Sequence, residues 1–406
     1  MLKALIILSS LIGGLVAGIL IGEQAPVVIS TADVIGTMWL NAMRMTVVPL
    51  VVSILITGIL QATLMARAGR MTLRAIVTMV VILWLSAAMS ALLTPALLDL
   101  FPLPAETAEG LRSVLAGKAA PSAVPPFTDT LRALIPSNVI DAAAKDQILP
   151  LIIFTLAFAF AISRLPDKQR DTLSSFFEAI SSAMIILIGW VLYVAPLGVF
   201  ALALVVGQKA GVESFAFFLH YVTIVIASGA VIWLASFALA FVGAGKNPVT
   251  FFIAAVPAQV VAISTQSSLA SLPAMVSGAK AIGVGTRSTD VVFPVAVALF
   301  RATGPCMNLA VAIYVAHLLG VQLTAGQLAL GVAAAAITTM GAVSLPGSIS
   351  FISSIAPINL AMGLPIEPLA LLLAIETFPD IMRTLGNVTM DMAVTATIAK
   401  AEGDIT

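Results

Sequence analysis

Long apolar runs dominate this chain and restrict the folds that it can adopt. A helix needs about 20 consecutive apolar residues to cross the roughly 30 Å hydrocarbon core of a bilayer. Hydrophobic residues make up 60% of the 406 residues and charged residues only 9%, so lipid must cover much of the apolar surface. The sequence therefore predicts an all-α integral membrane protein that crosses the lipid bilayer many times. We expect eight transmembrane helices, near residues 4–22, 35–65, 71–101, 146–163, 172–206, 213–243, 289–320 and 366–399.

The ionisable and sulfur-containing residues exclude several other classes of protein. Lys plus Arg and Asp plus Glu each number 19, so the formal net charge is zero and we expect no nucleic-acid partner. One cysteine (Cys306) and two histidines (His220 and His317) are too few for a disulfide framework, a zinc site or a haem ligand pair. We therefore expect no organic cofactor and no certain metal site.

Basic residues are distributed unequally between the two sides of the predicted membrane protein. With a cytoplasmic N-terminus, most Lys and Arg residues fall on the inside, and four of the outside ones lie in one extramembrane loop, 102–145. Cytoplasmic loops are enriched in Lys and Arg. The pattern favours a multi-pass protein of the cell membrane with both termini in the cytoplasm. We expect this membrane to be the bacterial inner membrane.

Two further apolar segments, 248–278 and 325–357, are interrupted by polar, proline-containing centres. Each half is too short to cross a bilayer, and non-helical backbone at membrane depth is tolerated only where protein or a water-filled cavity satisfies it. We interpret both segments as re-entrant helical hairpins that face a binding site. The alternative is two pairs of short ordinary helices joined by turns.

The last apolar run carries a polar stripe. Its polar residues are three or four positions apart, which places them on one face of a helix. Charged groups at bilayer depth cost at least about 2.5–3.5 kcal/mol each, so this face should line a polar cavity. The alternative is an Asp380–Arg383 pair that only locks the helix to its neighbours. The stripe consists of Glu376, Asp380, Arg383, Thr384, Asn387 and Asp391.

These residue types together indicate the ligand. The planar guanidinium of Arg383 fits a carboxylate, and Asp380 one turn away can accept an ammonium group. Ser267, Ser268 and Asn387 could hold a second carboxylate. The predicted ligand is a small acidic amino acid or a close relative, such as a dicarboxylate.

Several motifs resemble those of the dicarboxylate/amino acid:cation symporter family, the glutamate and aspartate transporters. Residues 265–273 resemble the family's TRSSSGTLP run, 341–347 its GTAGVPG run, and 195–201 its APxGVFAL run. Residues 380–391 match the pattern D-x-x-R-T-x-x-N-x-x-x-D, which is the most specific of the four. The resemblance covers nearly the whole chain and implies transport and symport of amino acids or dicarboxylates, not an enzyme.

The resemblance also implies an architecture of inverted repeats, with eight helices and two hairpins assembled as a homotrimer. A static scaffold would support a transport domain that moves like an elevator. The scaffold and trimerisation domain would be mainly 1–70 and 146–206, and the transport domain mainly 71–101 and 213–406, including hairpins 248–278 and 325–357.

By the same resemblance, the substrate site would combine the last helix with both hairpin tips. Arg383 would bind the side-chain carboxylate and Asp380 the amine, while Thr384 would line the pocket. Ser268, Asn387 and the backbone of the second hairpin would bind the α-carboxylate. The substrate-binding residues are then Arg383, Asp380, Thr384, Asn387, Ser267, Ser268, Ser344, Leu345 and Gly347.

One family motif is missing. The sodium-binding NMDGT of the seventh helix falls on residues 300–304, FRATG. We hypothesise that the guanidinium of Arg301 takes the place of a sodium ion and pairs with Asp391, Glu376 or the substrate, so that sodium coupling is weakened. The alternative is that Arg301 points to another face. Na⁺ or H⁺ remains the expected coupling ion, with Glu376, Asp391, Asn387 and Arg301 as the coupling residues.

Two other functions stay open at this point. An uncoupled facilitator or anion channel on the same fold would also explain the missing sodium motif. An intramembrane enzyme is disfavoured, because the chain contains no G-x-S-x-G and no H-E-x-x-H motif.

Overall fold

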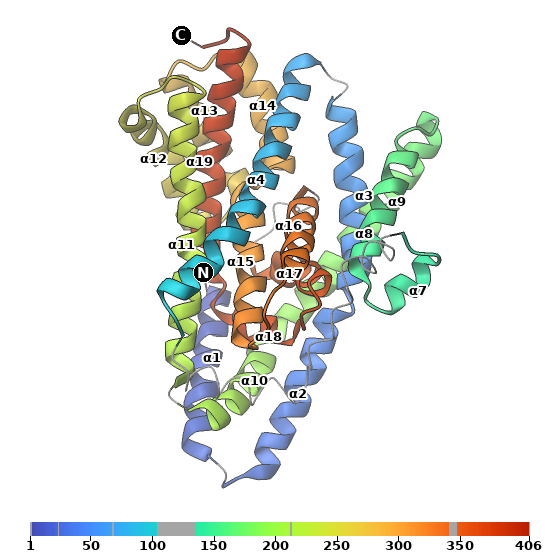
Figure 1. Cartoon of the computed structure of the whole chain (residues 1–406), viewed down its shortest axis with the longest axis vertical. Coiled ribbons are helices and arrows are strands. Elements are labelled where there is room, and N and C mark those ends of the chain that lie inside the picture. Colours follow the sequence, from blue (N-terminus) through green and yellow to red (C-terminus); the bar gives the residue numbers. More distant parts are fainter. Residues whose placement is uncertain are drawn as a thin grey trace.

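The computed structural model describes residues 2–22, 24–66, 69–103, 135–211, 213–340 and 347–405, and almost all of them are helical (Figure 1). The first half of the chain forms α1 (Leu2–Ile21), α2 (Pro26–Arg44), α3 (Val47–Ala66), α4 (Arg70–Leu100), α7 (Val139–Ala144), α8 (Ile148–Ile162), α9 (Asp167–Tyr193) and α10 (Ala195–Ala210). The second half forms α11 (Glu213–Val242), α12 (Pro248–Thr265), α13 (Ser268–Ala281), α14 (Thr286–Leu299), α15 (Thr303–Leu318), α16 (Ala325–Met340), α17 (Gly347–Ala361), α18 (Glu367–Leu372), the 3-10 turn η1 (Leu373–Ile375) and α19 (Thr377–Ala401).

The predicted all-α membrane architecture is confirmed, but several expected crossings are interrupted. Six helical segments of the described residues are long and apolar enough to cross a membrane. The run expected at 172–206 divides into α9 and α10 at Val194, because Pro196 starts a new helix. The run expected at 35–65 likewise divides between α2 and α3. The run expected at 289–320 divides between α14 and α15.

Both candidate hairpins fold as pairs of short helices. In the first hairpin, α12 and α13 pack against each other and are joined at Gln266, whose left-handed φ of 52° reverses the chain. The Ser267 hydroxyl then caps α13 by accepting a 3.2 Å hydrogen bond from the Ala270 amide. In the second hairpin, α16 and α17 pack together, and the tip 341–346 lies outside the described residues. Re-entry of the hairpins into a bilayer stays a prediction.

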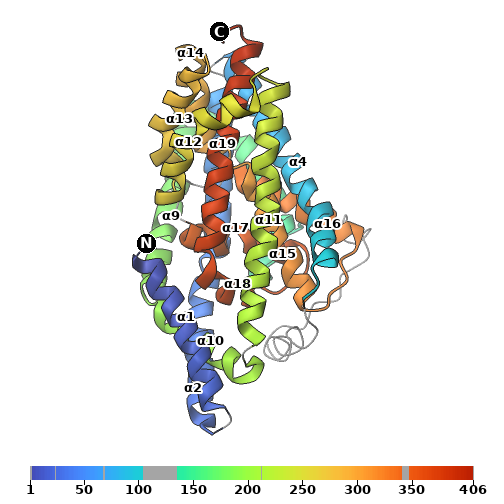
Figure 2. The same cartoon turned by 90° about the vertical axis from the view of Figure 1, so that its left-hand side faces the viewer.

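The helix α1 packs along α10 through glycines. A Cβ atom at Gly18 would lie 2.1 Å from the carbonyl oxygen of Leu204, and one at Gly14 would lie 2.5 Å from that of Phe200. Only glycine permits this approach of one backbone to the other, as at close helix contacts in membranes generally. Figure 2 shows the two helices side by side below α19.

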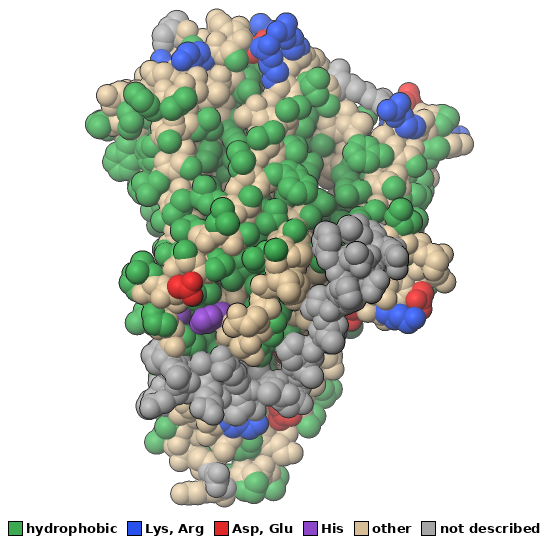
Figure 3. Space-filling model, in the orientation of Figure 1, with side chains coloured by type: hydrophobic (Ala, Val, Ile, Leu, Met, Phe, Trp, Pro, Cys, Tyr) green, Lys and Arg blue, Asp and Glu red, His purple; other side chains and the backbone are tan. Residues whose placement is uncertain are grey.

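The helix α19 runs through the opposite part of the molecule, where it packs against α11, α12, α13 and α14 (Figures 1 and 2). The C-terminal residues fasten this group. The Ser288 amide donates to Asp404 at 2.7 Å, and Arg74 of α4 forms a 2.5 Å ion pair with Glu402. Lys and Arg side chains gather at this end of the face in Figure 3, and apolar side chains cover most of its middle.

A small cavity of about 20 Å³ separates α3 from the second hairpin. Its walls are apolar on the α3 side, at Leu50 and Leu55, and carry hydroxyls on the hairpin side, at Thr338, Ser353 and Ser354. The cavity is large enough for about one water molecule.

Candidate functional site

The polar stripe begins at a break in the last apolar run. The turn η1 ends at Ile375, Glu376 follows, and α19 begins at Thr377. Pro379 therefore lies in the first turn of α19, where its missing amide hydrogen leaves no helix bond unmade.

The structure buries the stripe almost completely. Glu376 and Asp391 are 0% exposed, Asn387 is 2% exposed, and Asp380 and Thr384 are each 5% exposed. Carboxylates buried to this extent need charged or hydrogen-bonding partners. Their partners therefore describe what the site can do.

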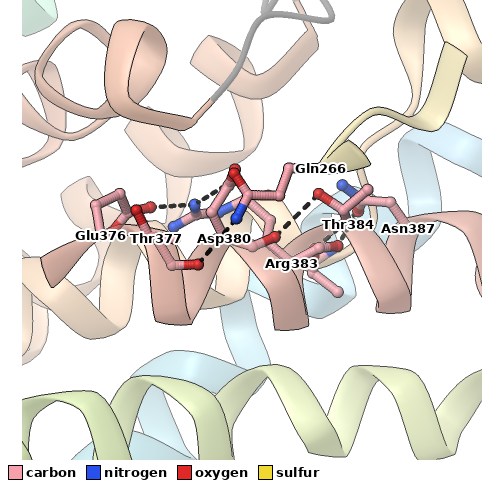
Figure 4. A network of polar contacts seen from close by, with 8 residues as sticks. Gln266, Glu376, Thr377, Asp380, Arg383, Thr384 and Asn387 are labelled. Carbon is pink, nitrogen blue, oxygen red and sulfur yellow. Dashed lines mark hydrogen bonds and ion pairs between the residues drawn. The ribbon is translucent and has the colours of Figure 1, made fainter. Parts of the chain in front are cut away.

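Arg383 pairs with two of these carboxylates, and it does so through a single nitrogen. Its Nη1 donates to Oε1 of Glu376 and, at 3.1 Å, to Oδ1 of Asp380 (Figure 4). Its Nε and Nη2 atoms are buried and have no hydrogen-bond partner among the described residues. The Asp380–Arg383 pair that we considered as an alternative thus exists, but it accounts for only part of the guanidinium. The remaining Nε–Nη2 edge presents two N–H groups that suit a carboxylate.

The first hairpin reaches this site through Gln266. Its Nε2 donates to the carbonyl oxygen of Thr377 at 3.3 Å (Figure 4). Ser268 is buried next to this turn, and Ser267 lies between the two. The structure thus brings the hairpin tip to the start of α19, as the prediction requires. Our sequence reasoning missed Gln266, although it stands where the family run has arginine.

Asn387 binds the start of α15. Its Oδ1 accepts from the amide of Thr303 at 2.9 Å and lies 2.7 Å from the Thr303 hydroxyl. That hydroxyl also lies 2.8 Å from the carbonyl oxygen of Arg383. The predicted substrate contact at Asn387 is therefore limited to its NH₂ group. Thr384 donates its hydroxyl to the Asp380 carbonyl at 2.9 Å and lies on the same face.

Arg301 lies at the break between α14 and α15. Asp391 and Asp380 attract its guanidinium, and Arg383 repels it. Neither carboxylate oxygen of Asp391 has a hydrogen-bond partner among the described residues. Arg301 thus acts on this buried carboxylate without a hydrogen bond to it.

These residues do not fit a sodium ion well. Phe300 and Ala302, which are 2% and 0% exposed, carry no side-chain oxygen at the break. Hard cations require several oxygen ligands, and Asp391 alone offers only its own two. In the part of the chain that the structure describes, no group of three or more His, Cys, Asp or Glu residues could hold a metal.

The remaining predicted site residues belong to the second hairpin. Ser344 and Leu345 fall in 341–346, outside the described residues, and Gly347 is the first residue of α17. His220 does not belong to the stripe. Its ring nitrogens lie 2.9 Å from the Tyr314 hydroxyl and 2.7 Å from the Phe101 carbonyl oxygen.

Comparisons with known proteins identify the family. The model of the sodium:dicarboxylate symporter family matches residues 7–401. The chain is 28% identical over 405 residues to the proton/glutamate-aspartate symporter of Escherichia coli, covering 96% of this chain and 91% of the relative. It is 27% identical over 403 residues to the proton/sodium-glutamate symport protein of Bacillus subtilis, with 96% and 91% covered. It is 26% identical over 403 residues to the C4-dicarboxylate transport protein of Leptothrix cholodnii, with 97% and 88% covered.

Proposed function

Because the chain belongs to the sodium:dicarboxylate symporter family, we propose that it is a secondary active transporter of acidic amino acids or dicarboxylates. The observation that carries this proposal is the Nε–Nη2 edge of Arg383, which is buried without a hydrogen-bond partner among the described residues. A carboxylate can accept two parallel N–H bonds from this edge. The names of the relatives, which specify glutamate, aspartate or C4-dicarboxylates, support the same substrate class.

The carboxylate of Asp380 decides between the two kinds of substrate. It is 5% exposed and shares Nη1 of Arg383 with Glu376. A substrate ammonium group beside Asp380 would balance its negative charge, whereas a plain dicarboxylate brings no cation of its own. An acidic amino acid therefore needs fewer additional cations beside Asp380 than a plain dicarboxylate does.

The proposed movement is an elevator-like displacement of the transport domain, 71–101 and 213–406, against a trimeric scaffold, 1–70 and 146–206. The packing supports this division. In the proposed transport domain α19 packs against α11, α12, α13 and α14, and in the proposed scaffold α1 packs against α10. Cross-linking of the purified protein in lipid tests the assembly, and a largest product of two subunits or one would contradict a homotrimer.

The proposed coupling ion is the proton, with sodium coupling weakened. Arg301 supplies a fixed positive charge next to Asp391, and the residues on either side of it, Phe300 and Ala302, supply no oxygen for sodium. Glu376 and Asp391 are the buried carboxyl groups that can carry a proton. A relative named as a proton symporter supports this choice.

Uptake by proteoliposomes tests the function. Wild-type protein should concentrate radiolabelled aspartate or succinate when an inward proton gradient is imposed without sodium. Arg383→Ala should reduce this uptake about 30-fold or more, because the substrate carboxylate loses its only forked donor in a dry site. Arg383→Lys keeps the charge and should also fail, since an ammonium group lacks the fork. Arg287→Ala, at an exposed arginine, is the control; full uptake by Arg383→Ala would refute the site.

The same assay separates a symporter from the second candidate, an uncoupled facilitator on the same fold. The absence of sodium ligands at residues 300 and 302 favours the facilitator only if no other ion replaces sodium. A facilitator would equilibrate labelled aspartate across the membrane without concentrating it. The triple variant Phe300→Asn, Arg301→Met, Ala302→Asp rebuilds the first three residues of the family motif and should increase the sodium dependence of uptake.

A further inference from the structure

Two apolar stretches of the chain each contain one charged residue that no motif explains. Arg44 is the single charged residue between positions 34 and 66, and Glu367 is the single Asp, Glu, Lys or Arg residue between positions 302 and 375. Charged side chains are rare in membrane-spanning segments, where they usually pair with one another. The structure pairs these two although 323 positions separate them in the chain. Nη1 of Arg44 lies 3.3 Å from Oε1 of Glu367.

Arg44 has a second partner in the connection between α7 and α8. Its Nη2 lies 3.0 Å from Oδ2 of Asp146. Asp146 has a left-handed φ of 54°, a conformation that aspartate adopts more readily than most residues. Two hydrogen bonds hold this turn: the Asp146 amide donates to the carbonyl oxygen of Ala143 at 3.3 Å, and the Gln147 amide donates to that of Ala142 at 2.8 Å. The turn thus fixes one carboxylate beside Arg44.

The two carboxylates belong to different parts of the molecule. Arg44 ends α2 and Asp146 lies just before α8, and both belong to the proposed scaffold. Glu367 begins α18 in the proposed transport domain, and α18 contacts both α10 of the scaffold and α17 of the second hairpin (Figure 1). The guanidinium of Arg44 therefore spans the boundary between the two proposed domains, with a separate nitrogen for each carboxylate.

The ion pair across this boundary is the more buried of the two. The side chain of Glu367 is 17% exposed, whereas that of Asp146 is 38% exposed. A carboxylate in the more buried position loses more stabilisation when its cation leaves. A contact that is made in only one of two states stabilises that state relative to the other. The pair with Glu367 therefore favours the arrangement that the structure shows.

We propose that Arg44 is a latch between the two domains, an inference that rests on the proposed elevator-like movement. In the state that the structure shows, Arg44 binds Glu367 and holds the start of α18 against the scaffold. When the transport domain moves, the ion pair with Glu367 breaks, and Arg44 keeps its ion pair with Asp146. The retained partner keeps the guanidinium in position to bind Glu367 again when the domain returns.

Cross-linking tests whether Arg44 and Glu367 separate during transport. The variant Arg44→Cys, Glu367→Cys places one thiol in each proposed domain, and the matched control Arg44→Cys, Asp146→Cys places both thiols in the scaffold. The reagent is a bifunctional methanethiosulfonate with a spacer as long as the replaced side chains. Cys306 is 0% exposed and does not compete for it. Both pairs should cross-link in proteoliposomes. The cross-link to position 367 should abolish uptake of radiolabelled aspartate until a reducing agent releases it, whereas the cross-link to position 146 should leave uptake unchanged.

Charge variants measure the strength of the latch. Glu367→Gln and Asp146→Asn each remove one carboxylate from Arg44, but only Glu367→Gln removes the ion pair that must break. Glu367→Gln should raise the initial rate of aspartate uptake about two- to fivefold at low ionic strength, and the gain should shrink in high salt, which screens exposed charges. Asp146→Asn should not raise the rate. Arg44→Gln should raise it as Glu367→Gln does, and the two together should give no further gain.

The outcomes separate the latch from the proposed function. If wild-type protein takes up aspartate and the cross-link to position 367 leaves uptake unchanged, the latch is wrong and the transporter stands. The latch is also wrong if only the control pair cross-links, if both cross-links abolish uptake, or if Glu367→Gln raises the rate no more than Asp146→Asn does. If wild-type protein takes up neither aspartate nor succinate, the proposed function fails and the latch fails with it. Elution of each variant as wild-type protein on size exclusion identifies variants that fold.

Discussion

The interaction between Arg301 and Asp391 can be measured by removing each charge in turn. Asp391→Asn removes the buried carboxylate but keeps its size, and Arg301→Met removes the cation but keeps a long apolar side chain. Because Asp391 is 0% exposed and Arg301 acts on its carboxylate without a hydrogen bond to it, Arg301→Met should leave that carboxylate without its cation, whereas in Asp391→Asn the guanidinium of Arg301 keeps the attraction of Asp380. The double variant should remove both charges together.

Removal of one member of a buried ion pair typically costs about 3–5 kcal/mol, whereas replacement of both members is often neutral. We therefore expect Arg301→Met to lose up to about 3–5 kcal/mol of unfolding free energy, Asp391→Asn to lose less, and the double variant to recover most of the larger loss. The ion pair between Arg74 and Glu402 is the comparison, since the Arg74 side chain is 37% exposed. The same set of two single variants and one double variant at Arg74 and Glu402 should give a coupling energy of at most about 1 kcal/mol.

The assay is denaturant unfolding of the purified protein in one detergent, with sodium absent and then present at high concentration. Losses in the double variant that equal the sum of the two single losses would show that the side chains do not interact, and would remove Arg301 from the proposed coupling. Sodium should not stabilise the wild-type protein. It should stabilise Arg301→Met more, because that variant leaves the carboxylate of Asp391 free for an ion.

Three other changes test separate parts of the structure. Asp380→Asn should weaken binding of aspartate far more than binding of succinate, and equal losses in competition binding would argue against an ammonium contact. Asn387→Leu should lower the unfolding free energy by about 1–3 kcal/mol, because the buried amide of Thr303 loses its acceptor. Gly18→Val should prevent close packing against Leu204 and lower the thermal stability, whereas Gly189→Ala, where a Cβ meets no atom within 4 Å, should not.

The sequence predicted the polar stripe because α19, together with Glu376 directly before it, places all its members. Side chains three and four positions apart share one face of a helix wherever that helix lies. Burial of Glu376, Asp380 and Asn387 then follows from the free-energy cost of exposing polar side chains to lipid. The helix pairs at 248–278 and 325–357 could also be predicted, since polar residues interrupt both apolar segments, although Pro273 lies inside α13 and not in the turn.

Features that depend on another part of the chain were not predictable in this way. The break before α15 is stabilised by Asn387, which is 84 positions away from Thr303, and an apolar run contains no sign of such a partner.

The glycine contact between α1 and α10 has a mechanical consequence. Where the backbone at Gly18 rests on the backbone at Leu204, no rotamers are available to absorb a displacement, so the two helices must shift as a single body. The boundary between α3 and the second hairpin is different, because a void the size of one solvent molecule separates Leu50 and Leu55 from Ser353 and Ser354. Side chains at this boundary can therefore change rotamer into the void, which the backbone contact at Gly18 does not permit.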